Sequence, residues 1–191
     1  MSLSKPVAAL SCTAALSAVL LGGCSPSSQA GAGMMGGDHG YHYSRLACSP
    51  PVTLPGATVQ VVLADMGMTR MMGGDAPLGG RMMLHAAPTV VAAGTVSLVA
   101  RNLGWRTHEL IVLPLTAASS AGERLAGPDG KVPEAGSLGE ASSSCAAGQG
   151  DGITSGAVGW VTLNLAPGRY ELVCNLKNHY VNGMHDELDV R

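Results

Sequence analysis

Three residues with metal-binding side chains follow one another at five-residue intervals near the end of the chain. In the segment CNLKNHYVNGM, Cys174 offers a thiolate, His179 an imidazole and Met184 a thioether. Copper that changes oxidation state without changing geometry is held by two imidazoles, one thiolate and a weak thioether. His108, which begins the segment HELIVLPL far upstream, would supply the second imidazole. These residue types in this spacing indicate a mononuclear copper site.

Each of these residues also has a simpler interpretation. Cys174 could instead form a disulfide with an earlier cysteine. Taken singly, His179 is more typical of a surface loop and Met184 of core packing. His85 in MMLHAAP competes with His108 as the second imidazole, but the apolar strand pattern that follows His108 is missing there. Only the joint spacing favours the metal site over these alternatives.

The elements that must position the site are short β-type segments separated by Pro and Gly, and no long stretch has a helical period. Alternation of apolar and polar residues places His108, Cys174 and Met184 on the core-facing side at strand ends. Several short strands with regular turn signals favour an all-β sandwich. The predicted strands are 58–66, 89–102, 108–115, 157–165, 169–174 and 186–191.

Residues 116–156 interrupt this succession of short strands, because they are too polar and too rich in glycine to predict a sheet. A connection of this length in a compact domain is either functional or held in place by a covalent link. Cys145 lies in this segment and would supply such a link if it pairs with Cys48. The expected fold is therefore a β-sandwich with a long loop insertion before the last strands.

The first 24 residues have the layout of a secretory signal, with Lys5, an apolar run and small residues before Cys24. The LGGC ending resembles a bacterial lipobox, in which the signal is cut before the cysteine and the cysteine is lipidated. An ordinary signal peptide and a retained transmembrane helix are the alternatives, although the apolar run is short for a bilayer span. We expect residues 1–23 to be the signal, 24–50 a flexible tether and 51–191 the folded domain.

The motif C-x4-H-x4-M from Cys174 to Met184, together with His108 in THELIV, resembles the cupredoxins, the small blue copper proteins. The spacing of the ligand loop is most similar to sulfocyanin-like and rusticyanin-like members, and the resemblance covers roughly residues 55–191. It implies a Greek-key β-sandwich, one type 1 copper and electron transfer through the partly exposed edge of His179. Asn102 is expected to hydrogen-bond around the thiolate or to tie the ligand loops together.

Charge and motif content exclude several other functions. The chain carries 11 Lys+Arg and 13 Asp+Glu, and removal of residues 1–23 takes away Lys5, so the balance becomes more negative. With no basic stripe, a nucleic-acid partner is not expected. A multicopper enzyme would need further histidine-rich sites, but no H-x-H pair occurs, and a dinuclear centre would need a second ligand-loop cysteine. We therefore expect a carrier and not an enzyme.

Methionines form a second feature, since eight of them lie between residues 34 and 83, ahead of His108, and soft thioethers select Cu(I). The segment MGMTRMMGG is consistent with a Cu(I) site and equally with core packing, whereas Met82 and Met83 are interpreted as core packing in a protein without phenylalanine. The candidate Cu(I) ligands are Met66, Met68, Met71 and Met72.

Two functions follow from these observations. The favoured one is an extracytoplasmic blue copper protein, anchored to the membrane by lipid, that carries single electrons between redox protein partners as a monomer. The alternative is a copper chaperone or buffer that binds Cu(I) through its methionine-rich segments. The two differ in how many copper ions each chain would hold.

Overall fold

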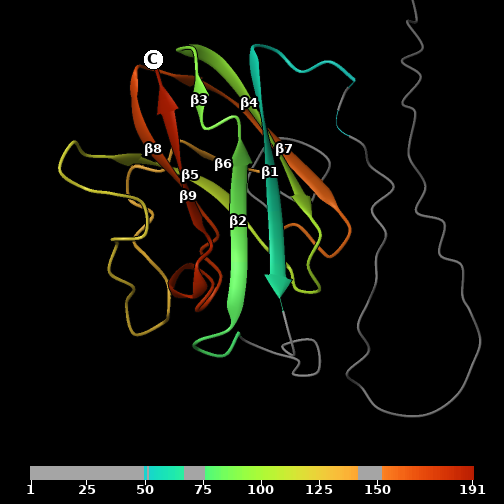
Figure 1. The fold of residues 1–191 in the computed structure, drawn as a ribbon, viewed down its shortest axis with the longest axis vertical. Coiled ribbons are helices and arrows are strands. Elements are labelled where there is room, and N and C mark those ends of the chain that lie inside the picture. The colour runs from blue at the N-terminus through green and yellow to red at the C-terminus, as the bar shows by residue number, and fades with distance from the viewer. Residues whose placement is uncertain (1–49, 51, 67–75, 142–151) are drawn as a thin grey trace, which may run out of the picture. The chain divides into compact units, whose positions relative to one another are not determined.

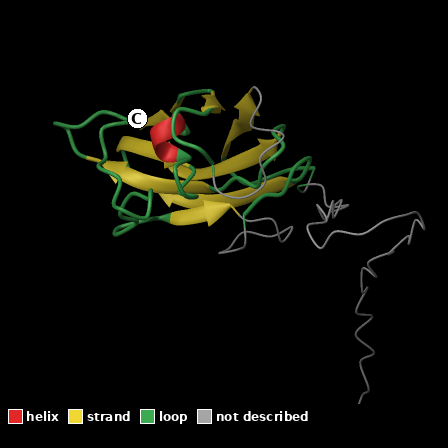
Figure 2. Cartoon of the chain, turned by 90° about the horizontal axis from the view of Figure 1, so that it is seen from below, coloured by secondary structure: helices red, strands yellow, loops and turns green. Residues whose placement is uncertain are grey.

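The computed structural model describes residue 50 and residues 52–66, 76–141 and 152–191. Within them the chain forms two β-sheets that lie in two layers (Figures 1 and 2). The expected signal sequence, the lipidation site Cys24, the tether up to residue 49 and the Cys48–Cys145 pair fall on residues outside these ranges. No helix among the described residues is long and apolar enough to cross a membrane.

The first sheet has four strands in the order β2-β1-β4-β7, and the second has five in the order β3-β9-β8-β5-β6. Strand β1 runs parallel to β4 and β3 runs parallel to β9, while the other pairs are antiparallel. The first sheet comprises β1 (Ala57–Met66), β2 (Arg81–Ala87), β4 (Gly94–Asn102) and β7 (Val158–Leu165). The second comprises β3 (Val90–Val91), β5 (Leu110–Leu115), β6 (Gly139–Ala141), β8 (Gly168–Val173) and β9 (His185–Val190).

The core fills the space between the inner faces of the two sheets. Strand β7 passes through the turn at Pro167 into β8 of the other sheet, so Val161 and Leu172 belong to one buried cluster. Alternating strands that bury one face place their apolar residues there at a period of two. The expectation of an all-β sandwich is confirmed, and the single short helix in the described part is the 3-10 turn η2 (Tyr180–Asn182).

Three details differ from the sequence analysis. The predicted strand 89–102 is divided into β3 and β4, which belong to different sheets. Strand β2 was not predicted, although its alternating burial is visible afterwards in Met82 and Leu84, which point inward between exposed neighbours. The polar segment 116–156 was expected to contain no sheet, but Gly139–Ala141 forms β6 and pairs with β5. Three residues are too few to show a period, so the contact with β5 decides their conformation.

Candidate metal site

The four predicted ligands come from two places at one end of the second sheet. Cys174 follows β8 directly and Met184 precedes β9 directly, so the loop 174–184 joins two neighbouring strands. His108 lies just before β5 and is fixed by a β-bridge in which it exchanges two backbone hydrogen bonds with Ile153, at 3.0 and 2.6 Å. The long segment 116–156 thus returns to the site through Ile153.

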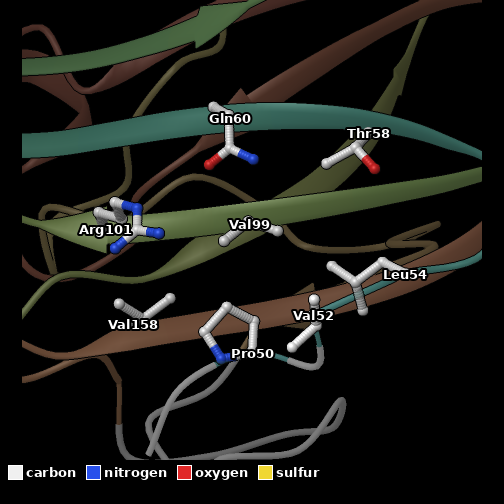
Figure 3. A pocket seen from close by; sticks show the side chains of 8 residues that line it. All are labelled: Pro50, Val52, Leu54, Thr58, Gln60, Val99, Arg101 and Val158. Carbon is white, nitrogen blue, oxygen red and sulfur yellow. The ribbon is translucent and has the colours of Figure 1, made fainter.

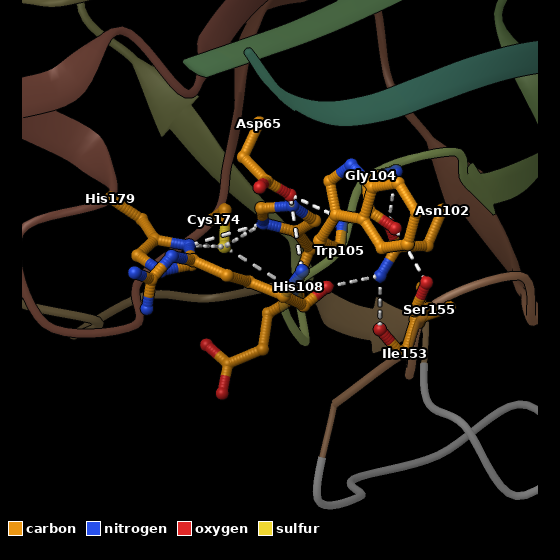
Figure 4. A network of polar contacts seen from close by, with 11 residues as sticks. Asp65, Asn102, Gly104, Trp105, His108, Ile153, Ser155, Cys174 and His179 are labelled. Carbon is orange, nitrogen blue, oxygen red and sulfur yellow. Dashed lines mark hydrogen bonds and ion pairs between the residues drawn. The ribbon is translucent and has the colours of Figure 1, made fainter. Parts of the chain in front are cut away.

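Two ring nitrogens and one sulfur form a small buried triangle (Figure 4). The Nδ1 atoms of His108 and His179 are 3.1 Å apart, and the Cys174 Sγ lies 3.9 and 3.2 Å from them. A triangle with these sides has a circumscribed circle of about 2 Å radius, which is close to the length of metal–nitrogen and metal–thiolate bonds. The three side chains therefore fit one cation at the centre of the triangle.

Met184 ends the ligand loop and is joined to His179 and Cys174 by backbone hydrogen bonds. Its N–H donates to the carbonyl of His179 at 3.2 Å, and its own carbonyl accepts from the N–H of Cys174 at 3.1 Å. Its side chain is fully buried in the core cluster that also contains Cys174. Gly183, at the left-handed φ of 102°, ends η2 and lets the chain turn into β9.

Two asparagines clamp the ligand loop to the segment before β2. Asn178 donates from its side chain to the carbonyl of Ala76 at 2.8 Å. Asn182 donates to the carbonyl of Pro77 and accepts from the N–H of Gly79, both at 2.9 Å. Neither asparagine was singled out in the sequence, because an amide in a loop gives no signal of the distant backbone groups that it will meet.

Burial controls the protonation of the ligands. Burial raises the pKa of the Cys174 thiol to about 12, although the N–H of Glu109, 3.1 Å from Sγ, and the N–H of Leu176 act in the opposite direction. Burial, with a smaller contribution from the neighbouring His108, lowers the pKa of His179 to about 3. At neutral pH the imidazole of His179 is therefore uncharged and the thiol keeps its proton until a cation replaces it.

Asn102 lies close to the site but away from the sulfur. Its side-chain amide donates to the carbonyls of Arg106 and Ile153 at 2.6 and 2.7 Å, and its oxygen accepts from the N–H of Gly104 at 2.8 Å. Through these contacts it ties the turn before His108 to the segment at Ile153 (Figure 4). The backbone N–H of Glu109 makes the hydrogen bond to the thiol that had been considered for Asn102.

Asp65 is a buried site residue that the sequence analysis missed. Its Oδ1 lies 3.2 Å from Nε2 of His108, and both side chains are fully buried. Asp65 stands in an apolar strand pattern more than forty residues before His108, and only the pairing of β1 with β4 brings the two together. A charged residue at a core-facing strand position was the one available signal.

Other candidates from the sequence lie elsewhere. His85 is 63% exposed in its side chain and pairs with Asp186 at 3.4 Å, so it does not join the triangle. Met82 is buried in the core as expected, whereas Met83 is 38% exposed and its interpretation as core packing was wrong, because it has the opposite parity on β2. Met68, Met71, Met72 and the side chain of Met66 fall outside the described residues.

A groove on the outer face of the first sheet contains none of the predicted ligands (Figure 3). It lies over β1, β4 and β7, on the side away from the core. Its lining residues are Pro50, Val52, Leu54, Thr58, Gln60, Val99, Arg101 and Val158.

Comparisons with known proteins return copper proteins among solved structures. No family model matches the chain, and no curated protein matches it. It is similar to reduced auracyanin from Roseiflexus castenholzii, with 18% identity, coverage of 71% of this chain and 99% of that one, and a TM-score of 0.42. Auracyanin A, a "blue" copper protein from Chloroflexus aurantiacus, has 20% identity, coverage of 71% and 98%, and a TM-score of 0.40.

Rusticyanin from Thiobacillus ferrooxidans, with 20% identity, coverage of 71% and 79% and a TM-score of 0.38, is a third similar structure. At this level of similarity the metal and the activity of the chain have to be argued from its own donor atoms.

Proposed function

We propose that this protein carries single electrons on one copper ion held by His108, Cys174, His179 and Met184. The observation that carries this proposal is the buried triangle of two imidazole nitrogens and one sulfur, with its centre about 2 Å from each. Copper in such a site supplies a reversible one-electron change. Two imidazoles, a thiolate and a distant thioether form the donor set of electron-transfer copper sites.

The surrounding chain holds these donors in place independently of a metal. The ligand loop is closed on itself by hydrogen bonds from Cys174 to Met184 and from Met184 to His179. The clamp from Asn178 and Asn182 fixes the same loop from outside. A donor set held by hydrogen bonds of the protein itself favours electron transfer, because both oxidation states must then accept nearly the same geometry.

His179 is the expected point of electron entry and exit. Its exposed fraction is 4%, whereas His108, Cys174 and Met184 are all at 0%. The partly exposed edge implied by the resemblance is therefore not seen, because His179 is buried, but it is the one of the four ligands with any exposed surface toward a redox protein partner. Among the described residues, His108, Cys174 and His179 form the single group of this kind, whereas a multicopper enzyme needs further sites.

The location of the protein is part of the proposal. Residues 1–23 would direct export, Cys24 would carry lipid, and residues 24–50 would tether the domain 51–191 to the membrane on its extracytoplasmic side. Fractionation of cells that produce the wild type and a Cys24→Ser variant tests this. The wild type should remain with the membrane and the variant should become soluble; equal distribution of both would contradict lipid anchoring.

Copper buffering is the second candidate, and the flanks of the methionine-rich segment favour it. Asp65, just before this segment, contacts His108, and Ala76, just after it, accepts a hydrogen bond from Asn178 of the ligand loop. The described residues on both sides of this segment thus contact either His108 or the ligand loop. A chain that takes up further Cu(I), and loses this extra uptake when Met66, Met68, Met71 and Met72 are replaced together, would support buffering.

Electrochemistry on the copper-loaded chain tests the proposed function. An electron carrier should show a reversible one-electron wave at one copper per chain, and the wave should persist through repeated cycles. Loss of copper on reduction would contradict the proposal, because a carrier has to retain the metal in both oxidation states.

A further inference from the structure

A carboxylate stands directly behind one of the two imidazoles. Oδ1 of Asp65 lies 3.2 Å from Nε2 of His108, while Nδ1 of the same ring faces His179 and Cys174 (Figure 4). Both side chains of this pair are fully buried. The ring of His108 thus connects a buried carboxylate on β1 with the donor triangle.

The position of this carboxylate is set by its surroundings. Oδ1 of Asp65 also accepts the backbone N–H groups of Trp105 and Arg106 at 2.7 and 3.1 Å. At Gly104 an added Cβ would lie 2.1 Å from this oxygen and 2.9 Å from Nε2 of His108. Glycine is therefore needed at this position for space, since any side chain would push into the contact between Asp65 and His108.

The geometry around Asp65 indicates which atoms donate and which accept. Oδ1 of Asp65 accepts the backbone N–H groups of Trp105 and Arg106, so it faces Nε2 of His108 as an acceptor. An acceptor oxygen is matched by a ring nitrogen that carries a proton. The proton of His108 is then on Nε2, which leaves the lone pair of Nδ1 free for a metal.

We propose that Asp65 is a positioning and charge-setting residue, which holds His108 in the tautomer that can bind copper and lowers the reduction potential of the site. This inference rests on the proposed copper site. The thiolate of Cys174 and the carboxylate of Asp65 together carry two negative charges. They balance Cu(II) and exceed the charge of Cu(I), so in a buried environment they favour the oxidised form.

Two matched substitutions separate this role from a general loss of charge. Asp65→Asn keeps an oxygen that can accept the same hydrogen bonds, but it removes the charge and can also donate to Nε2. Asp186→Asn removes one charge from the second His–Asp contact among the described residues, where His85 is 63% exposed in its side chain. Solvent screens that second pair, so its removal should affect the copper far less.

The first measurement uses the full chain without added metal and reads the ring nitrogens of His108 by ¹⁵N NMR. Wild type and Asp186→Asn should show the proton of His108 on Nε2, and Asp65→Asn should lower the share of this tautomer. A wild-type His108 with its proton on Nδ1 would overturn the inference. This readout does not depend on copper, so it remains informative if the proposed function fails.

The second measurement is the reduction potential of the copper-loaded proteins. Asp65→Asn should favour Cu(I) over Cu(II) by about tenfold relative to wild type, a rise of about 59 mV for one electron. Asp186→Asn should shift the potential by less than about a third of this amount. Equal shifts in the two variants would overturn the charge-setting role of Asp65.

If Asp65→Asn does not fold, Gly104→Ala provides the same test with the charge retained. The added methyl group crowds Oδ1 of Asp65 and should lower the share of the Nε2–H tautomer of His108. An unchanged tautomer in Gly104→Ala would overturn the positioning role. A normal blue copper spectrum combined with the wrong tautomer would refute this inference alone, whereas absence of copper binding would refute the proposed function.

Discussion

The Nδ1 atoms of His108 and His179 lie 3.1 Å apart, with their rings in an edge-on arrangement at an interplanar angle of 61°. Two ring nitrogens in such a buried contact are satisfied either by one shared proton or by one shared cation. The Sγ of Cys174 stands 3.2 Å from one of them and 3.9 Å from the other. Binding of a metal ion to these three atoms should therefore displace protons, and this displacement can be measured.

Copper binding should release protons. Because burial raises the pKa of Cys174 to about 12, the thiol is protonated at pH 7, whereas His179, with its pKa lowered to about 3, is already neutral. Binding of Cu(II) near pH 7 should release about one proton per chain, and the affinity should rise about tenfold per pH unit. Titration in weakly buffered solution counts these protons; a binding step without proton release would contradict the account.

Replacement of the thioether should change the potential more than the binding. Met184→Leu keeps a buried apolar side chain of similar volume, so the fold should tolerate it. Leucine donates no electron pair, and the loss matters more for Cu(II) than for Cu(I), so the reduction potential should rise while one copper per chain is retained. Voltammetry with a metal count checks both points, and loss of copper from this variant would show that Met184 is a principal ligand.

The stability of the protein should depend on Glu140 of β6. Burial, followed by repulsion from Glu109 and Glu134, raises the pKa of Glu140 to about 7, and its Oε1 accepts no hydrogen bond from the described residues. In the unfolded chain this carboxyl ionises near pH 4.5. Its contribution to folding is therefore fully present below about pH 4.5 and is lost as the pH rises through 7.

Glu140→Gln should accordingly stabilise the protein above pH 7 and have little effect near pH 4.5. The gain should be on the order of 1 kcal/mol, since the side chain is partly exposed and solvent screens its charge. Urea unfolding of both proteins at the two pH values measures the difference. A gain of equal size at both pH values would show that ionisation of Glu140 is not the cause.

The buried carboxylate of Glu171 should contribute strongly to stability. It accepts hydrogen bonds from the N–H of Gly122, the guanidinium of Arg124 and the hydroxyl of Tyr180, so it holds the inserted segment against the residue that follows His179. Glu171→Gln leaves the arginine without its charged partner and should cost about 3–5 kcal/mol of unfolding free energy.

Glu187, which is paired in register with Glu171 on the neighbouring strand β9, provides a control for this prediction. Glu187 pairs with Arg169, and both side chains are about one-third exposed. Glu187→Gln should therefore cost much less than Glu171→Gln in denaturant unfolding. Similar losses in the two variants would mean that the inserted segment is not held through Glu171.

The sequence predicted the second sheet better than the surroundings of the site. Spacing and strand parity were enough to place Cys174 and Met184 at strand ends, because both depend on local periodicity. Asp65 and Asn182 could not be assigned, since their partners in other segments lie 40 residues or more away in the chain and depend on how the sheets pair. The short strand Gly139–Ala141 was not predicted for the same reason, because its pairing with β5 leaves no pattern in the local sequence.

The central claim is that Cys174 binds copper as a thiolate beside two imidazoles. The most direct test is the visible absorption spectrum of the purified protein after addition of Cu(II), with a copper count on the same sample and on Cys174→Ser. We expect an intense blue or green band at one copper per chain in the wild type, and no such band in the variant. A colourless wild type, or a Cys174→Ser protein that keeps the band, would contradict the assignment.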